Sequence, residues 1–322
     1  MVPASCVVGV DLGGTKLLAG AVDEGLRVHH RAHRVIAGLG QSELLDAVAA
    51  AVREAAAAAG RDPTAVGFGI PALIDRGRGM AISCVHLPLA GLAFGDLMAE
   101  RLGLPCVIDN DANAAALAEH RHGAARGARH AVVLTIGTGI GGALILDGRL
   151  YRGAVGAAGE LGHMVIDADG PLCPGNCPNR GCLEALASGT ALALEARHQA
   201  TQLPASALGQ ALAPGREISG PMVTELAHEG DPAARRAIAL IGQRLGIGLA
   251  NIANVFNPER IVVGGGVIAA GELLLAPARD EMTERSLRPS GEMVQVLPAR
   301  FGAEAGMLGA AALAHDSIAA RA

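Results

Sequence analysis

The residue types best suited to chemistry gather within residues 159–184, where one histidine precedes three cysteines. Thiolate sulfur and imidazole nitrogen are the donors that zinc prefers, and four of them complete a tetrahedral set. A complete set leaves no open position for a substrate, so the metal would be structural rather than catalytic. The alternative is a surface loop with free thiols, but the spacing resembles that of metal ligands. The four candidate ligands are His163, Cys173, Cys177 and Cys182.

Two carboxylates, Glu160 and Glu184, flank these candidate ligands. A zinc ion would therefore fix a loop whose ends carry acidic hydrogen-bond acceptors. We expect this segment to form a rigid polar wall of a ligand pocket.

Two glycine-rich turns share a pattern in which threonine and glycine stand between two apolar strands. Glycine lets backbone N–H groups approach phosphate oxygens closely, and threonine adds a hydroxyl donor, so together the turns can hold a polyphosphate. Neither turn is a Walker A or Rossmann motif, because each leads into a strand rather than a helix. The alternative for each turn is an ordinary hairpin. The candidate phosphate-binding residues are Gly13, Gly14, Thr15 and Lys16 in the first turn, Thr138 and Gly139 in the second, and Gly264, Gly265 and Gly266 after a third apolar run.

Two aspartates complete the candidate chemistry. Asp11 precedes the first turn and would hold Mg²⁺ through water, because magnesium keeps part of its hydration shell. Asp111 follows an apolar run, at the kind of strand-to-helix junction where open α/β sheets bind ligands. Phosphoryl transfer requires a base or orienting group for the acceptor hydroxyl, and Asp111 can supply it. The alternative for Asp111 is a helix N-cap, a position that Asp and Asn favour.

Apolar runs that predict strands alternate with amphipathic stretches that predict helices, which indicates an α/β fold. The chain has 322 residues, more than a typical single core needs, so two domains are expected. Residues 200–220 are the most loop-rich stretch. The predicted strands cover 7–12, 17–22, 66–70, 106–109, 131–136, 143–146 and 261–263, and the predicted helices cover 41–59, 111–120 and 232–256.

Composition argues against several classes of protein. The chain is 51% hydrophobic and 18% charged, which is typical of a globular protein. A formal net charge of -5 with dispersed arginines argues against nucleic acid as a partner. The first ten residues lack the basic region of a signal peptide, and the longest uncharged run, 131–146, is too short to span a bilayer. We therefore expect a cytoplasmic protein with no membrane partner, where reduced thiols suit zinc.

Taken in order, the motifs resemble those of the ROK group of bacterial sugar kinases and repressors, within the hexokinase–actin ATPase-like superfamily. The resemblance implies a duplicated ribonuclease-H-like fold, with ATP held between two domains and a hexose in the cleft. We expect a small domain over 1–112, a large domain over 113–302 with the zinc loop, and a C-terminal helix over about 303–322 packing on the small domain. The motifs cover 11–16, 110–113, 137–142, 159–163, 181–184, 263–267 and 306–311.

The resemblance also implies roles for individual residues. Asp111 would face the 6-hydroxyl of the hexose as the base, and His163 would bind zinc through one ring nitrogen and the sugar through the other. The implied cofactors are ATP, Mg²⁺ and structural Zn²⁺, and the implied assembly is a homodimer or homotetramer. The residues implied to contact the sugar are Asn110, Glu160, His163 and Glu184.

Glucokinases are the members that the chain resembles most, partly through residues 300–306. Glucose is therefore the expected substrate and ATP the expected donor, with polyphosphate as the alternative donor. N-acetylglucosamine or N-acetylmannosamine kinase and fructokinase are the alternatives. A sugar-responsive regulator of the same family would carry a helix-turn-helix ahead of the first turn, whereas Asp11 lies close to the start of this chain, so we prefer a kinase.

The chain departs from the family pattern at three places. The usual Cys-x-Cys-x4-Cys is here Cys173-x3-Cys177-x4-Cys182, and we expect the wider loop to retain zinc. The usual Pro-Gly before the sugar-binding turn is Pro71-Ala72, which would be strained if φ had to be positive. His86 stands in a loop where glucokinases commonly show a different pattern, which leaves the choice of hexose open.

Overall fold

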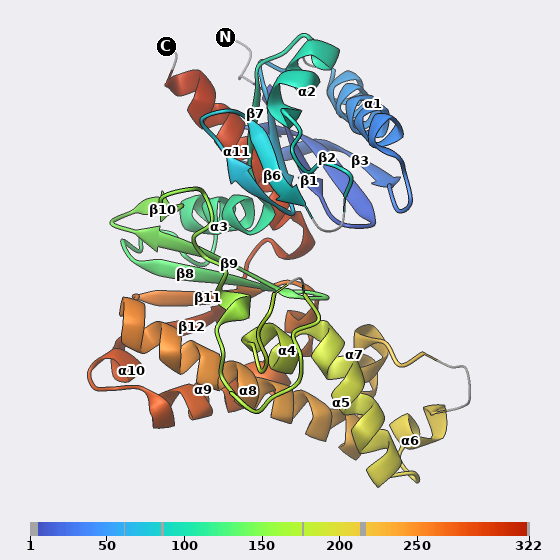
Figure 1. Ribbon diagram of the computed structural model, residues 1–322, viewed down its shortest axis with the longest axis vertical. Helices are drawn as coiled ribbons and strands as arrows, with labels where there is room; N and C mark the ends of the chain where they lie inside the picture. The colour runs from blue at the N-terminus through green and yellow to red at the C-terminus, as the bar shows by residue number, and fades with distance from the viewer. Residues whose placement is uncertain (1–5, 61, 85–86, 176, 213–216, 321–322) are drawn as a thin grey trace. The chain divides into compact units, whose positions relative to one another are not determined.

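All the predicted strands and helices are present in the structure, a computed structural model that describes residues 6–60, 62–84, 87–175, 177–212 and 217–320. The chain forms two compact units (Figure 1), and each is assembled from separate stretches of sequence. The first unit contains Met1–Gly127, Arg149–Ala158 and Ala303–Ala322, and the second contains Ala128–Gly148 and Gly159–Gly302.

The first unit contains strands β1 (Cys6–Leu12), β2 (Lys16–Asp23), β3 (Val28–Val35), β4 (Val66–Ile70), β5 (Ala72–Asp75), β6 (Met80–Cys84), β7 (Cys106–Asn110) and β10 (Arg149–Tyr151). Its helices are α1 (Gln41–Ala59), α2 (Phe94–Leu102), α3 (Asp111–His122) and α11 (Ala305–Ala319), the last preceded by a short 3₁₀ turn at Gly302–Glu304. The sheet order is β3-β2-β1-β4-β7. β1 pairs antiparallel with β2 and parallel with β4, and β4 pairs parallel with β7. β5 and β6 form a separate antiparallel pair.

The second unit contains strands β8 (Ala131–Ile136), β9 (Ile140–Leu146), β11 (Arg260–Gly264) and β12 (Gln295–Pro298). Its helices are α4 (Leu183–Ala187), α5 (Gly189–Gln202), α6 (Ala207–Ala211), α7 (Gly220–His228), α8 (Pro232–Phe256), α9 (Glu272–Arg285) and α10 (Ser290–Met293), with 3₁₀ turns η1 (Leu161–His163) and η2 (Gly266–Ala270). β8 pairs antiparallel with β9 and parallel with β11, which pairs parallel with β12. The order β9-β8-β11-β12 thus repeats the order and directions of β2-β1-β4-β7, as a duplicated ribonuclease-H-like fold requires.

Helix α1 illustrates how the sequence determines these elements. Leu44, Val48 and Val52 are buried and recur every four positions, so they form the apolar face that packs on the sheet. The helix ends at Gly60, which adopts φ 62°, a left-handed conformation that glycine takes without steric cost. The predicted bounds, 41–59, agree with the structure for this reason.

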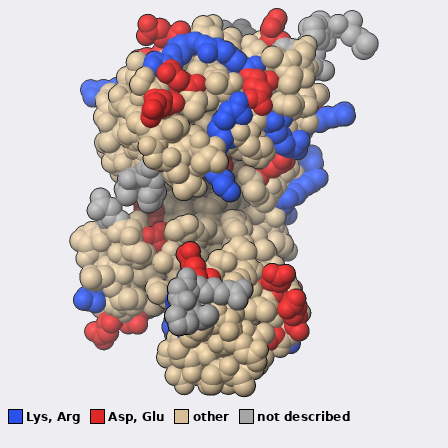
Figure 2. All heavy atoms as spheres, turned by 90° about the vertical axis from the view of Figure 1, so that its right-hand side faces the viewer, with Lys and Arg blue, Asp and Glu red and all other residues tan. Residues whose placement is uncertain are grey.

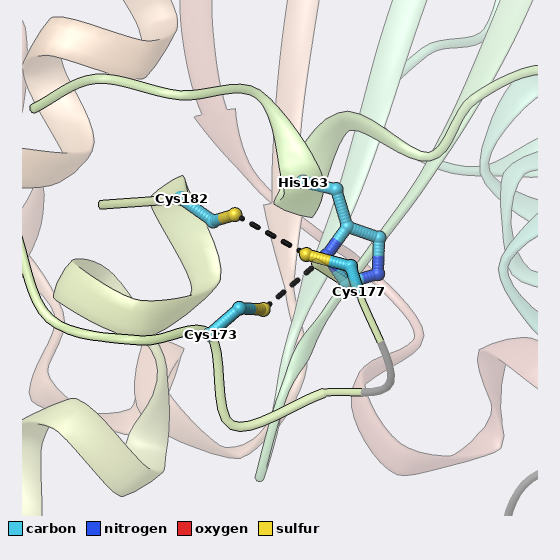
Figure 3. Close-up of side chains that lie close together, drawn as sticks. All are labelled: His163, Cys173, Cys177 and Cys182. Carbon is cyan, nitrogen blue, oxygen red and sulfur yellow. Dashed lines mark hydrogen bonds between the residues drawn. The ribbon is translucent and has the colours of Figure 1, made fainter. Parts of the chain in front are cut away.

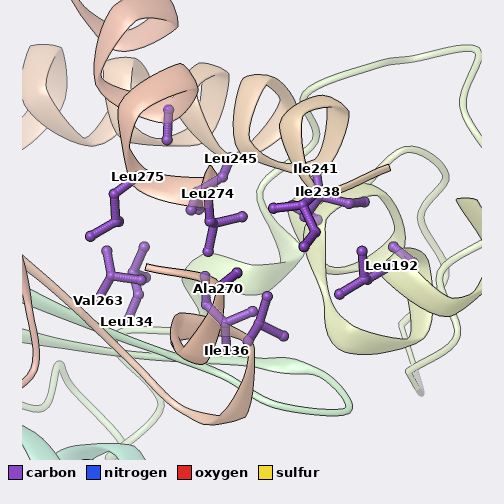
Figure 4. Packing of buried hydrophobic residues seen from close by; sticks show 14 of the residues in the cluster. Leu134, Ile136, Leu192, Ile238, Ile241, Leu245, Val263, Ala270, Leu274 and Leu275 are labelled. Carbon is purple, nitrogen blue, oxygen red and sulfur yellow. The ribbon is translucent and has the colours of Figure 1, made fainter. Parts of the chain in front are cut away.

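Each unit has its own hydrophobic core. In the first, the rings of Phe68 and Phe94 meet edge to face, with centroids 5.2 Å apart. In the second, Leu134 and Ile136 of β8 and Val263 of β11 lie beneath α8 and α9 (Figure 4). α8 is long and apolar enough to cross a membrane by length and composition, but 56% of its apolar window is buried inside the structure, as in the core helix of a globular unit.

Close approach between backbones brings α11 onto the first sheet. A Cβ at Gly67 of β4 would lie 1.8 Å from the carbonyl oxygen of Ala310, and one at Gly309 would lie 1.6 Å from that of Ala114 in α3. A side chain at either position would therefore hold α11 away from the sheet or from α3. These glycines explain why α11 packs on the first unit.

The division into units differs from the sequence-based division at residue 112. α3 packs against α11 and β4, so the first unit extends to Gly127, and it also includes Arg149–Ala158. The alanine-rich sequence of α3 predicts a buried helix without indicating which sheet covers it. Within the predicted loop-rich stretch 200–220, the described residues include α6.

On the face of the molecule shown in Figure 2, basic and acidic side chains lie next to one another over the first unit. Ion pairs within the first unit include those of Arg31 with Glu304 and of Arg34 with Glu54. The charges of these four side chains are therefore compensated locally.

Candidate active site

Asp11 occupies the end of β1 in the first unit, close to Asp111 at the start of α3. Gly69 of β4 lies between them: a Cβ there would be 3.8 Å from Oδ1 of Asp11 and 3.5 Å from Cα of Asp111. Burial, and next the charge of Asp111, raise the pKa of Asp11 to about 7. Two neighbouring carboxylates that repel each other form a natural place for a divalent cation.

Gly306 in α11 provides the space that the Asp11 carboxylate occupies. A Cβ at this glycine would lie 2.5–2.7 Å from the carboxylate atoms of Asp11. Glycine is therefore required sterically at position 306 of the 306–311 motif, a requirement that the sequence alone did not reveal.

Asn110 and Asp111 are held at the N-terminus of α3. The side chain of Asn110 is the N-cap: its Oδ1 accepts a hydrogen bond from the backbone N–H of Asn113 at 3.1 Å. Its Nδ2 donates to the carbonyl oxygen of Ala72 at 3.4 Å. Asp111 is the first helical residue and is partly exposed, so the helix N-cap proposed as the alternative role for it belongs to Asn110.

Ala72 itself is not strained. The described non-glycine residues with positive φ are Leu26, Asp147 and Asn257, so alanine occupies the Pro71-Ala72 position in an ordinary extended conformation. The other position in doubt, His86, lies outside the described residues.

A buried ion pair that no sequence pattern indicates lies next to the start of α3. Asp109 is 2% exposed, and its Oδ2 accepts hydrogen bonds from Nε and Nη2 of Arg152 at 2.8 and 2.6 Å. Its Oδ1 accepts from Nδ2 of Asn113 and from the backbone N–H of Asn110. Nε of Arg76 lies 3.7 Å from Oδ2. A single arginine far along the chain gives no spacing signal by which the pair could have been found.

The first glycine turn is a tight connection between β1 and β2. The backbone N–H of Gly13 donates to the carbonyl oxygen of Lys16 at 2.8 Å, and Gly14, Thr15 and Lys16 are exposed. Their backbone and side-chain donors are therefore accessible to a ligand, as the phosphate-binding hypothesis requires.

In the second unit, two candidate phosphate segments lie side by side at the ends of parallel strands. Gly264 of β11 pairs with Thr135 of β8, so residues 264–266 and the turn after Ile136 leave the sheet at the same edge. A Cβ at Gly265, which has φ 88°, would lie 2.4 Å from the carbonyl oxygen of Ile136. Only glycine fits this conformation and this approach.

The four candidate zinc ligands converge in the second unit (Figure 3). Their ligand atoms all lie within 4.8 Å of one another, with Sγ of Cys177 3.5 Å from Sγ of Cys182 and Sγ of Cys173 3.5 Å from Nδ1 of His163. Two sulfur atoms bound to one tetrahedral zinc ion are about 3.8 Å apart, so the donor set and its dimensions fit zinc. The longer spacing between the first two cysteines still leaves Cys173 within the cluster.

The two nitrogens of His163 face different partners. Nδ1 is next to Cys173, while Nε2 lies 4.0 Å from Oε2 of Glu160. This arrangement is compatible with metal on Nδ1 and a sugar hydroxyl near Nε2. Burial raises the pKa of Cys173 to about 12 and also raises that of Cys182, and a bound metal ion would favour the thiolate form of both.

Glu184 is buried rather than open to the surface. It is 9% exposed, and its Oε2 accepts a hydrogen bond from the backbone N–H of Ile140 at 2.8 Å. A Cβ at Gly139 would lie 2.3 Å from this oxygen. The structure therefore places Glu184 against the second glycine turn, which the sequence analysis did not predict, and its contact with a sugar stays a prediction.

Comparison with known proteins agrees with these features. A model of the ROK family matches residues 7–317. A glucokinase of Streptomyces coelicolor is 35% identical over 96% of this chain and 97% of its own length, and a glucokinase of Thermotoga maritima is 32% identical over 98% and 99%. A ROK family glucokinase from Streptomyces griseus, solved in complex with glucose and AMPPNP, superposes with a TM-score of 0.86 at 37% identity, covering 97% of this chain and all of that one.

Proposed function

Because the chain belongs to the ROK family, we propose that it is a glucokinase that transfers the γ-phosphoryl group of ATP to the 6-hydroxyl of glucose. The observation that carries this proposal is the placement of Asp111 at the start of α3, partly exposed and next to Asp11 of β1. Similarity to three glucokinases over nearly the whole chain favours glucose over N-acetylhexosamines and fructose.

The proposed reaction uses Asp111 as the base. Its carboxylate accepts the proton of the 6-hydroxyl while the hydroxyl oxygen forms a bond to the γ-phosphorus and the bond from phosphorus to the bridging oxygen of ADP breaks. Asn110 is held by its N-cap bond and by the Ala72 carbonyl, which leaves its amide oriented for a neighbouring hydroxyl. Glu160, His163 and Glu184 are the other proposed sugar contacts.

The two glycine turns are the proposed phosphate contacts. Gly13, Gly14, Thr15 and Lys16 would act from the first unit, and Thr138, Gly139 and residues 264–266 from the second. Mg²⁺, when bound, neutralises phosphate charge, and Asp11 is the residue proposed to hold it through water. Zinc, when bound to His163, Cys173, Cys177 and Cys182, supplies rigidity and no open coordination position. A cytoplasmic location, a role in glycolysis and assembly as a homodimer or homotetramer are further proposals that follow from the family resemblance.

The alternative is a sugar-responsive regulator without catalysis. The presence of Asp111, Gly14 and Gly139 favours the kinase, because a regulator has no need of a base beside the sugar. A steady-state assay with Mg²⁺ and ATP on glucose, mannose, fructose, N-acetylglucosamine and N-acetylmannosamine tests this. We expect the highest kcat/KM with glucose. A higher value for another sugar would reassign the substrate, and no turnover with any of them would favour the regulator.

Replacement of the base tests the mechanism. Asp111→Asn should lower kcat by about 10²–10⁴-fold and leave glucose affinity within roughly tenfold, because it removes the proton acceptor and keeps the hydrogen-bonding shape. Asp280→Asn, an exposed change of the same kind in α9, is the matched control, and it should not change kcat. Retention of most activity by the Asp111 variant would exclude Asp111 as the base.

A further inference from the structure

The junction between α4 and α5 contacts the second glycine turn along its length. The backbone N–H of Gly189 donates to the carbonyl oxygen of Gly137 at 2.8 Å. Oγ1 of Thr190 donates to the carbonyl oxygen of Thr138 at 2.9 Å, and the backbone N–H of Thr190 lies 3.4 Å from the same oxygen. The carbonyl groups of the turn are thus held by the helix junction.

Glu184 extends this contact to the zinc loop. Its Oε2 accepts from the N–H of Ile140 at 2.8 Å, at the end of the same turn. Its Oε1 faces the other way, 3.8 Å from Sγ of Cys173, and a Cβ at Gly175 would be 2.6 Å from it. One carboxylate therefore contacts both the turn and the loop that carries the candidate zinc ligands.

The segment between these contacts is short and rigid. Cys182, a candidate zinc ligand, is the N-cap of α4, a five-residue helix. Leu183, Ala187 and Ser188 have no exposed side-chain surface, so the helix cannot shift without disturbing the core. A displacement of Cys182 would be transmitted to Glu184 and to Thr190.

We propose that zinc binding and nucleotide binding are thermodynamically coupled through Glu184 and Thr190, which act as positioning residues for the second glycine turn. This inference rests on the proposed function, because it takes the turn to be the phosphate site. In this proposal the zinc loop has a second role in addition to sugar binding. It orders the backbone of the glycine turn that binds the phosphates of ATP.

Calorimetry without sugar measures this coupling without relying on turnover. AMPPNP and Mg²⁺ are titrated into zinc-loaded protein and into protein stripped with a chelator, with circular dichroism to confirm that the stripped protein is folded. We expect zinc removal to weaken AMPPNP binding on the order of tenfold. Coupling is reciprocal, so AMPPNP should strengthen zinc binding, measured against a chromophoric chelator, by the same factor.

Thr190→Val tests the route while the metal ligands stay intact. It removes the hydroxyl donor to Thr138, so the coupling factor should fall by roughly threefold to tenfold with zinc still bound. Thr201→Val is the matched control, because Oγ1 of Thr201 donates to a carbonyl oxygen in the same helix at 2.7 Å, that of His198. This variant should keep the wild-type coupling.

The outcomes separate this inference from the proposed function. Equal AMPPNP affinity with and without zinc would overturn the coupling and leave the kinase proposal standing. Absence of AMPPNP binding in both states would overturn both. Wild-type coupling in the Thr190 variant would remove Thr190 from the route.

Discussion

Arg152 donates two hydrogen bonds to a single oxygen of the buried Asp109, at 2.8 and 2.6 Å. Asp109 immediately precedes Asn110 and Asp111, and its other oxygen binds the backbone N–H of Asn110. The ion pair therefore fixes the end of β7 from which the proposed base projects. We predict that Arg152 contributes to catalysis by positioning Asp111, without contact to the reacting atoms.

Replacing Arg152 by Met should destabilise the protein by about 2–3 kcal/mol, because the buried Asp109 carboxylate loses both hydrogen bonds from Arg152 and keeps only the more distant Arg76 as a cation. It should also lower kcat, since the start of α3 loses its anchor. Denaturant unfolding and steady-state kinetics measure the two effects. Arg149→Met, an exposed change in β10, is the control and should alter neither.

The double variant Arg152→Met, Asp109→Asn isolates the charge effect. Removing both charges should recover part of the lost stability, since a neutral buried pair costs less than an unpaired carboxylate. If the stability loss of the double variant equals the sum of the losses of the two single variants, Arg152 and Asp109 do not interact energetically.

The raised pKa of Asp11 predicts how stability of the ligand-free protein depends on pH. The folded-state pKa is about 7 against an ordinary value of 3.8, so between these values the folded protein binds more protons than the unfolded chain. The free energy of unfolding should therefore fall as pH rises from about 4 to 7, by ~4 kcal/mol at most from this group. Unfolding curves across this range measure it.

Asp11→Asn removes the titrating group and serves as the comparison. Above pH 7 this variant should be more stable than the wild type without ligands, yet bind Mg²⁺ and ATP more weakly. A variant with the same pH dependence as the wild type would show that another group is responsible.

Alanine substitutions at Gly139 and Gly137, both in the second glycine turn, should have different effects on the stability of the protein. Gly139→Ala should destabilise the ligand-free protein by about 1–3 kcal/mol, because the new Cβ would lie 2.3 Å from Oε2 of Glu184. Gly137→Ala should be neutral or slightly stabilising, because a Cβ there meets no atom within 4 Å and its φ is not positive. Thermal unfolding compares them, and equal losses would contradict the steric account.

Zinc binding should release protons at neutral pH. Burial raises the pKa of Cys173 to about 12 and raises that of Cys182, so both are protonated without metal and ionised with it. Zinc affinity should consequently rise with pH, and titrations in buffers of different ionisation enthalpy count the protons. Cys106→Ser is the control: burial raises the pKa of Cys106 to about 12 as well, but it lies outside the cluster.

Hydrophobic periodicity, together with the residues that cap or end helices, was sufficient to predict the elements with strong local signals. The predicted helix 232–256 agrees with α8 because Asp231 caps it, Pro232 opens it and Asn257 ends it in a left-handed conformation. The ligand cluster was also predictable, because His and Cys at these spacings have few other structural uses.

Contacts between distant segments were not predictable, because they depend on three-dimensional packing. Neither the Arg152–Asp109 pair nor the bond from Ile140 to Glu184 leaves a pattern in the sequence. β3 was missed for a different reason: as an edge strand rich in His and Arg, it lacks the apolar alternation that marks a strand.

The packing of α11 has a consequence for synthesis of the chain. The ribosome makes β1 and β4 first, but Gly67 meets its partner, the carbonyl of Ala310, only when α11 has emerged. Until then one face of the sheet lacks its cover, so the second unit can finish folding before the first. A truncation that removes α11 should leave the nascent sheet prone to aggregation and dependent on chaperones.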